Sequence, residues 1–143
     1  MPIHLLFDLD GTLIDSSAGI LASMSATLVK CGIVPIVSLG KSLTGPPLRD
    51  TLQPLTCIDD SAQIDSLVNA FKADYDTDGY REAMAYPGIH TALISLQAAG
   101  NRLLIITNKR IAPTKSIISY LGWDTLFFGV FALDSFTLPC SIR

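Results

Sequence analysis

The chain has 143 residues, 49% of them hydrophobic and 16% charged, a composition that excludes a disordered chain. The 10 Lys and Arg residues against 13 Asp and Glu give a net charge of −3 with no basic cluster, which argues against a nucleic-acid partner. No apolar run approaches the roughly 20 residues of a membrane span, and the first residues lack the basic and then apolar pattern of a secretory peptide, so we expect a cytoplasmic protein with no membrane partner.

The first predicted element is a strand over residues 3–7, which is apolar on both faces as a central parallel strand is. It ends at the sequence Asp8-Leu9-Asp10-Gly11-Thr12. Acidic and hydroxyl side chains therefore follow the carboxyl end of a buried strand. Functional residues of α/β sheets lie at this end of the strands.

The interval between this strand and the next predicted strand is too long for a simple crossover connection. The hydrophobic patterns within the interval are helical. Ser16 or Ser17 is placed to cap a first helix. Gly45-Pro46-Pro47-Leu48 opens a short helix, and Asp59-Asp60-Ser61 caps a longer one. The apolar stripes of the first and third helices comprise Ile20, Leu21, Met24, Leu28, Ile64, Leu67, Val68, Phe71 and Tyr75. We therefore predict an inserted helical cap over residues 15–86.

Two further strands are predicted at 102–107 and 127–131, and a helical pattern precedes each of them, over residues 89–99 and 113–122. This alternation predicts an α/β fold with a Rossmann-like open parallel sheet. The predicted core comprises residues 1–14 and 87–143.

The three cysteines, Cys31, Cys57 and Cys140, are widely spaced and form no CxxC pair. With an odd number and no His pair nearby, neither a disulfide framework nor a zinc site is expected. We expect free, buried thiols that act as small apolar groups.

The carboxylates of Asp8 and Asp10 are the first candidate functional groups. At positions i and i+2 of a strand they point to the same side, and a divalent cation such as Mg²⁺ would relieve their repulsion. Gly11 permits a tight turn whose N–H groups can hold an anion, and Thr12 adds a hydroxyl. The structural alternative is an acidic turn in which Asp10 and Gly11 merely reverse the chain.

The string from Phe7 to Ser16, FDLDGTLIDS, resembles the first motif of the haloacid dehalogenase superfamily, and more narrowly that of its phosphoglycolate phosphatase branch. The resemblance continues through Gly45-Pro46-Pro47-Leu48, Tyr86-Pro87-Gly88 and Ile105-Ile106-Thr107-Asn108-Lys109. It spans nearly the whole chain, and the first motif is its most specific part.

The resemblance implies an Mg²⁺-dependent phosphatase of small phosphorylated metabolites that forms a phosphoaspartyl intermediate. Asp8 would be the nucleophile and a metal ligand. Asp10 would protonate the leaving alkoxide, later deprotonate the hydrolytic water, and bind the metal through its backbone carbonyl. Thr107 and backbone N–H groups near Gly11 and Asn108 would bind the phosphoryl oxygens. Since family dehalogenases lack the second aspartate, Asp10 favours phosphoryl chemistry.

Two of these candidate sites have a purely structural alternative. For the segment from Thr107 to Lys109, spacing alone favours a polar strand end, a turn and then a solvated charge. Arg49 follows the Gly45-Pro46-Pro47-Leu48 segment, and its guanidinium is a candidate to bind a substrate carboxylate when the cap closes. A solvated Arg on a cap helix is the equal alternative.

The sequence departs from the family after the third strand. The family's third motif supplies a Lys and its fourth supplies acidic metal ligands, and neither is found before Arg143. Asp134 resembles the acidic residue after this strand but cannot be equated with the fourth motif. We therefore expect weakened Mg²⁺ binding and an exposed apolar edge at Ile3–Phe7 that favours self-association. Alternatively, the C-terminus crosses that edge, or the chain is a fragment of a longer protein.

The leading hypothesis is therefore a phosphatase similar to phosphoglycolate phosphatase, with an α/β core and a helical cap. A second hypothesis is a phosphate-binding or interaction module that keeps Asp8, Asp10 and Thr107 without turnover. A third is a sugar-phosphate mutase or nucleotide phosphatase on the same scaffold.

Overall fold

The computed structural model describes residues 1–135 of the chain, which divide into two compact units. The sheet unit combines residues 1–15 with those from 84 onward, and the helical unit is the segment 16–83. The helical unit falls within the segment for which a cap was predicted. Its role as a cap stays a prediction.

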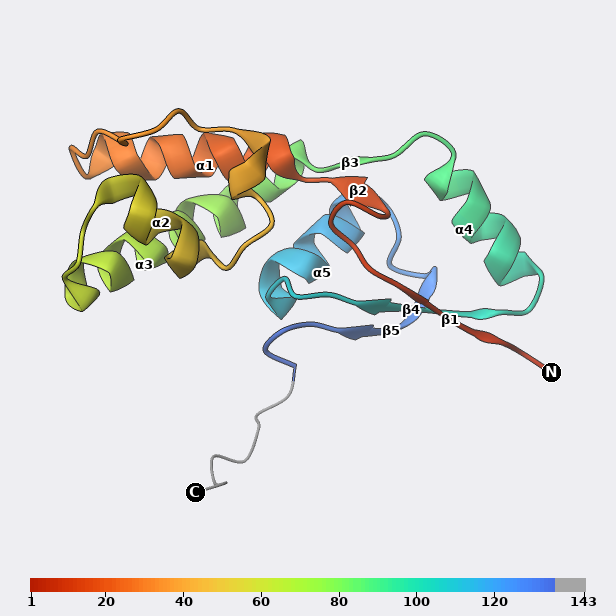
Figure 1. Ribbon diagram of the computed structural model, residues 1–143. Coiled ribbons are helices and arrows are strands. Elements are labelled where there is room, and N and C mark those ends of the chain that lie inside the picture. Colours follow the sequence, from red (N-terminus) through yellow and green to blue (C-terminus); the bar gives the residue numbers. More distant parts are fainter. Residues whose placement is uncertain (136–143) are drawn as a thin grey trace, which may run out of the picture. The chain divides into compact units, whose positions relative to one another are not determined.

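The sheet unit contains three parallel strands in the order β1-β4-β5, namely β1 (His4–Phe7), β4 (Arg102–Ile106) and β5 (Phe127–Phe131) (Figure 1). Phe7 pairs with Ile105, and Ile106 pairs with Phe131, so all three strands end at the same edge. The predicted α/β fold with an open parallel sheet is confirmed. The side chains that follow each strand therefore gather at this carboxyl edge.

Two helices, α4 (Ile89–Ala98) and α5 (Ile111–Tyr120), lie on the same side of the sheet (Figure 1). Both crossovers step in the same direction along the sheet, and right-handed connections then place both helices on one face. The buried side chains of this unit include Leu93, Leu103, Ile105, Ile117 and Trp123. The indole Nε1 of Trp123 donates a hydrogen bond of 2.9 Å to His90 Nδ1, which satisfies its buried N–H.

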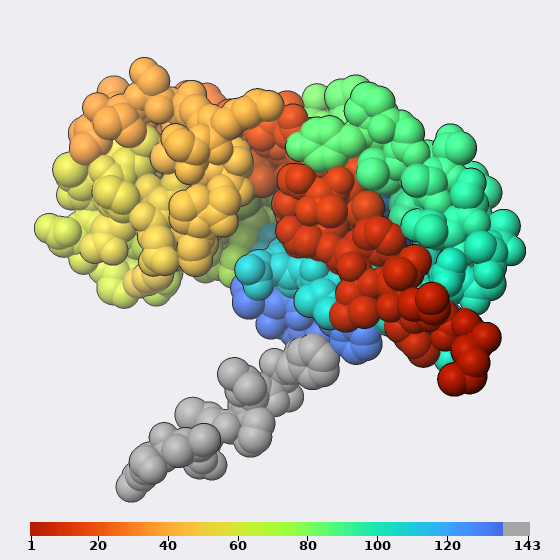
Figure 2. Space-filling view, turned by 45° about the vertical axis from the view of Figure 1, so that its right-hand side comes forward, coloured from red at the N-terminus to blue at the C-terminus, as the bar shows by residue number. Residues whose placement is uncertain are grey.

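Several large apolar side chains in or next to the strands are exposed in the described part of the chain. Among the described residues, β1 has β4 as its one neighbour in the sheet. Ile3 is 61% exposed, Leu6 is 59% exposed, and Phe128 on β5 is 66% exposed. The first residues, red in Figure 2, lie at the surface of their unit. The predicted exposed edge at the first strand is therefore present in this part of the chain.

A short antiparallel ribbon was not predicted. It joins β2 (Ile14–Asp15) to β3 (Met84–Ala85), and the N–H of Tyr86 extends it by donating to Leu13 O at 3.1 Å. Strands of two residues are too short to show the alternation that identifies a strand in sequence. The interval between the first two long strands is thus not purely helical.

The helical unit contains α1 (Ser17–Lys30), α2 (Leu48–Thr56) and α3 (Ser61–Thr77), at the predicted places, with short 3-10 turns η1 (Lys41–Leu43) and η2 (Gly79–Glu82). Its core is formed by Met24, Leu28, Leu52, Leu55, Ile64, Leu67, Phe71 and Tyr75. The rings of Phe71 and Tyr75 stack with centroids 5.6 Å apart. Burial of these stripes stabilises the unit.

The two predicted helix caps have different outcomes. The Asp60 carboxylate accepts hydrogen bonds from the N–H groups of Ala62 and Gln63, at 2.8 and 3.0 Å, and caps α3 as predicted. Ser16 stands at the N-cap of α1, but its side chain makes no capping bond. Its φ of −105° and ψ of 4° are not the extended conformation from which an N-cap side chain reaches the helix amides.

Helix α1 and turn η2 approach each other through two glycines. A Cβ added at Gly19 would lie 2.0 Å from the carbonyl oxygen of Gly79, and one added at Gly79 would lie 2.3 Å from Ser23 Oγ. Both glycines are buried. This close backbone approach therefore requires residues without a side chain.

The prediction of buried cysteines is wrong for Cys31 and Cys57, which are free but exposed. Each is a C-cap residue, of α1 and α2 respectively, and so lies at the end of its helix, outside the buried stripe. Cys140 lies outside the described residues. Over residues 1–135, no helix has the length and apolar character needed to cross a membrane.

Candidate functional site

Asp8 and Asp10 lie at the carboxyl edge, but the strand ends before them, at Phe7. Leu9 between them is fully buried, whereas Asp8 is exposed and the Asp10 side chain is 31% exposed. The alternation of an extended strand therefore continues past its last paired residue, because Leu9 is drawn into the core. Because Leu9 is buried, the carboxylates of Asp8 and Asp10 on either side of it lie on the more exposed side of the chain.

The turn after Asp8 closes on the carbonyl of Leu9, which accepts the N–H groups of Thr12, Leu13 and Ile14 at 3.3, 3.0 and 3.1 Å. Gly11 has a φ of +79° and donates its own N–H to Ile14 O at 2.8 Å. The amides of Gly11 and Thr12 are thus used inside the turn. This differs from the expectation of exposed amides there, so the need for glycine is conformational.

Thr107 follows β4 at the same edge and is 6% exposed. Its N–H donates to Phe131 O at 2.9 Å, and its Oγ1 accepts the N–H of Lys109 at 3.1 Å. Since Oγ1 serves as an acceptor there, the hydroxyl keeps its hydrogen for a further acceptor, such as a phosphoryl oxygen. The neighbouring Asn108 is exposed at the edge.

Lys109 is not the solvated charge that its spacing suggested. Its side chain is 10% exposed, and Nζ lies 3.4 Å from Asp10 Oδ1. The pair joins the loop after β4 to the loop after β1, which are far apart in the sequence. In the sequence, the signal for this pair is a lysine three positions beyond the end of β4, and it does not specify a partner.

Asp134, after β5, has a structural partner. Its Oδ1 accepts the N–H of Ile111 at 2.7 Å, at the first residue of α5. A carboxylate at a helix N-terminus satisfies a backbone N–H and offsets the helix dipole. Asp134 therefore supports the fold of the loop that carries Thr107 and Lys109.

The metal ligands predicted at Asp8 and Asp10 are oxygen donors, which suit Mg²⁺. Within residues 1–135, no group of three or more His, Cys, Asp or Glu side chains is placed to hold a metal ion. Because Mg²⁺ keeps several waters and takes substrate oxygens, the exposed Asp8 carboxylate and the Asp10 carbonyl fit a partial ligand set.

Arg49 lies in the helical unit, at the start of α2. Its guanidinium pairs with Asp65 and donates to Ser61 Oγ at 2.6 Å, and both partners lie on α3. These contacts join α2 to α3. Binding of a substrate carboxylate by Arg49 would require their exchange, and this role stays a prediction.

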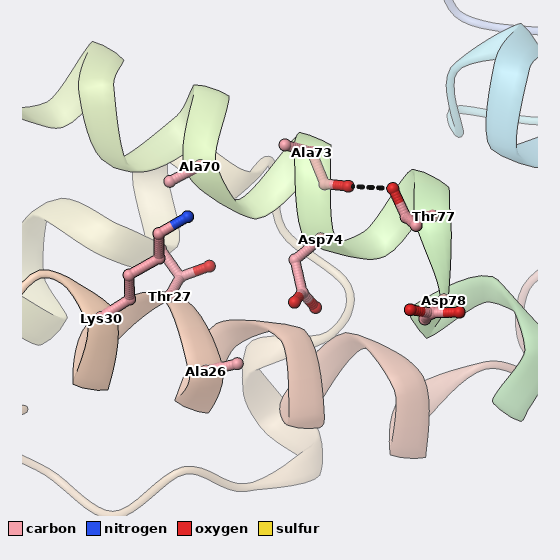
Figure 3. Close-up of a pocket in the computed structure, with 8 residues that line it drawn as sticks. All are labelled: Ala26, Thr27, Lys30, Ala70, Ala73, Asp74, Thr77 and Asp78. Atoms are coloured by element: carbon pink, nitrogen blue, oxygen red, sulfur yellow. Dashed lines mark hydrogen bonds between the residues drawn. The ribbon is translucent and has the colours of Figure 1, made fainter.

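A cavity of about 300 Å³ lies between α1 and α3 (Figure 3). The residues that line it are Ala26, Thr27, Lys30, Ala70, Ala73, Asp74, Thr77 and Asp78. None of the predicted site residues is among them. The cavity therefore lies in the helical unit, whereas Asp8, Asp10, Thr107 and Asn108 lie in the sheet unit.

Known proteins resemble the chain over most of its length. Tyrosine-protein kinase PtkA of Mycobacterium tuberculosis is 34% identical over 127 residues, which are 88% of this chain and 43% of the relative. Phosphoglycolate phosphatase of Agrobacterium fabrum is 29% identical over 136 residues, covering 92% of this chain and 58% of the relative. The chain thus spans about half the length of these curated relatives.

Solved structures extend the likeness to the fold. A hydrolase of the haloacid dehalogenase-like family from Streptococcus pneumoniae superposes with a TM-score of 0.77 at 28% identity, over 96% of this chain and 62% of that one. The family described as haloacid dehalogenase-like hydrolase matches residues 5–139, a span that includes both Asp8 and Thr107. With its parallel sheet and its acidic first loop, the chain belongs to the haloacid dehalogenase-like hydrolase family.

Proposed function

We propose that this chain carries the phosphoryl-transfer machinery of an Mg²⁺-dependent phosphatase acting on small phosphate monoesters, similar to phosphoglycolate phosphatase. The observation that carries the proposal is the gathering of Asp8, Asp10, Thr107 and Lys109 at one carboxyl edge of the sheet. Two carboxylates, a hydroxyl and an ammonium supply a nucleophile, an acid–base group and donors for phosphoryl oxygens. The phosphoglycolate phosphatase relative supports this choice of substrate class.

In the proposed reaction, a carboxylate oxygen of Asp8 attacks phosphorus while the bond to the leaving oxygen breaks. Asp10 gives a proton to that oxygen and then takes one from the water that hydrolyses the phosphoaspartyl group. Asp8 is exposed, and within residues 1–135 the bond its Oδ1 accepts is a local one, from the N–H of Leu9 at 2.8 Å, so the carboxylate is accessible to a substrate.

The hydroxyl of Thr107 and the loop at Asn108 would bind the phosphoryl oxygens. The N–H of Thr107 donates to Phe131 O and its Oγ1 accepts the N–H of Lys109, which pre-positions the hydroxyl. Mg²⁺, when bound by Asp8 and the Asp10 carbonyl, would offset the negative charge of carboxylate and phosphate.

The proposal is tested by hydrolysis of p-nitrophenyl phosphate and of phosphoglycolate with Mg²⁺ and with a chelator. We expect turnover of both esters with Mg²⁺ and loss of turnover with the chelator, because the charge on carboxylate and phosphate is then not offset. Absence of hydrolysis under both conditions, with retained binding of inorganic phosphate, would contradict the phosphatase and favour a phosphate-binding module.

The 34% identity with a protein named as a tyrosine kinase favours a second candidate function. A tyrosine hydroxyl would then replace water as the final phosphoryl acceptor, with ATP as the donor. Incubation with ATP followed by detection of phosphotyrosine separates the two functions. Phosphotyrosine formed without any monoester hydrolysis would favour the kinase.

We further propose self-association through the β1 edge, with a second copy of this chain as the partner. The support is the apolar surface at Ile3 and Leu6 on an edge strand whose backbone can pair with another strand. Light scattering should report dimers whose fraction rises with concentration, and Leu6→Lys should reduce that fraction because a charged edge strand resists pairing. Val29→Lys, on an exposed position of α1, is the matched control. A monomer at all concentrations contradicts this proposal.

A further inference from the structure

Lys109 and Asp10 form a partly buried ion pair at the carboxyl edge of the sheet. Enclosing a lysine side chain until it is only 10% exposed is costly unless a negative partner lies close to its ammonium. Asp10 supplies such a partner, with Nζ and Oδ1 3.4 Å apart, and its carboxylate is the more exposed of the two groups at 31%. The lysine is therefore the inner, fixed member of the pair, and the aspartate is the member that faces outward.

The backbone of Lys109 is fixed on both sides. Its N–H donates to Thr107 Oγ1 at 3.1 Å, and its carbonyl accepts the N–H of Leu133 at 3.0 Å. Two residues further on, the N–H of Ile111 donates to Asp134 at 2.7 Å. The loop after β4 is thus attached to the segment after β5, so the backbone from which the Lys109 side chain extends is held in place.

We propose that Lys109 is a positioning residue for Asp10: its ammonium holds Oδ1, and so fixes the carboxyl group where it passes a proton to the leaving oxygen. This inference rests on the proposed phosphatase function. In the acid step the proton is on the other oxygen, Oδ2, and moves to the leaving oxygen as the P–O bond breaks and the bond from Asp8 to phosphorus forms. Lys109 donates to Oδ1 whether the carboxyl is ionised or protonated.

The proposal makes a prediction about leaving groups. The alkoxide of phosphoglycolate needs a proton to leave, whereas the weakly basic p-nitrophenolate leaves without one. Lys109→Met should therefore lower kcat for phosphoglycolate about 10-fold more than kcat for p-nitrophenyl phosphate. Lys109→Arg, which keeps a cation able to donate to Oδ1, should recover most of that difference.

The matched control is Lys115→Met, which removes an exposed lysine from α5 and should leave both kcat values unchanged. Circular dichroism and Tm report whether each variant folds. If Lys109→Met does not fold, Lys109→Gln, which keeps a polar N–H donor but has no charge, is compared on the same two substrates.

The outcomes separate this inference from the proposed function. A wild-type chain that hydrolyses neither ester overturns both. A wild-type chain that hydrolyses both, with a Lys109 variant whose kcat falls equally for the two esters or does not fall, overturns only the positioning role. A larger loss with phosphoglycolate, recovered by Arg, supports it, since a merely structural lysine would lower both rates together.

Discussion

The Asp8→Asn variant should lose hydrolysis of p-nitrophenyl phosphate by roughly 10⁴-fold or more in kcat, the scale seen when an enzyme loses its nucleophile. An amide oxygen does not form the acyl phosphate that the reaction requires. The fold should survive, because Asp8 is exposed and its bond from the Leu9 N–H is one that an amide oxygen also accepts. Steady-state kinetics with Mg²⁺ measure the loss.

The control for Asp8→Asn is Asp59→Asn, which removes an exposed carboxylate from the helical unit and should retain wild-type kcat. Circular dichroism should show equal Tm values for the two variants and the wild type. If Asp8→Asn keeps more than a tenth of the wild-type kcat, as an order-of-magnitude limit, Asp8 is not the nucleophile and the phosphoaspartyl mechanism is wrong.

The Gly19→Ala variant should destabilise the helical unit by about 3 kcal/mol in the free energy of unfolding, the upper end of the usual cost of overpacking, because backbone must absorb the clash. In an exposed helix interior, Gly→Ala usually stabilises by roughly 0.5–1 kcal/mol. At Gly19 the substitution is instead destabilising, because the new Cβ would lie 2.0 Å from the backbone oxygen of Gly79. Backbone cannot rotate away as a flexible side chain can, so α1 and η2 must separate.

Thermal and urea unfolding followed by far-ultraviolet circular dichroism measure this effect, and the Tm should fall by about 10 °C. Gly40→Ala is the matched control: a Cβ there meets no atom within 4 Å and φ is −146°, so its stability should change by less than about 0.5 kcal/mol. A Gly19→Ala variant as stable as the wild type would show that the two elements are not packed as closely as described.

Much of the fold could be predicted because its signals are local. The apolar run before Asp8, the Asp60 cap and the stripe ending at Tyr75 each report an element through neighbouring residues, and the structure has those elements. The family could be predicted for the same reason, since its first motif is contiguous. The β2–β3 ribbon could not, because two residues carry no periodicity.

By itself, the sequence determined the types of the longer elements, the parallel sheet and the placement of acidic and hydroxyl groups after strand ends. Only the tertiary structure decided which charges meet: Lys109 with Asp10, Arg49 with Asp65, and Asp134 with the start of α5. It also decided that Cys31 and Cys57 are exposed. The physical reason is that periodicity and capping act over a few neighbouring residues, whereas an ion pair or a buried surface depends on atoms that only folding brings together.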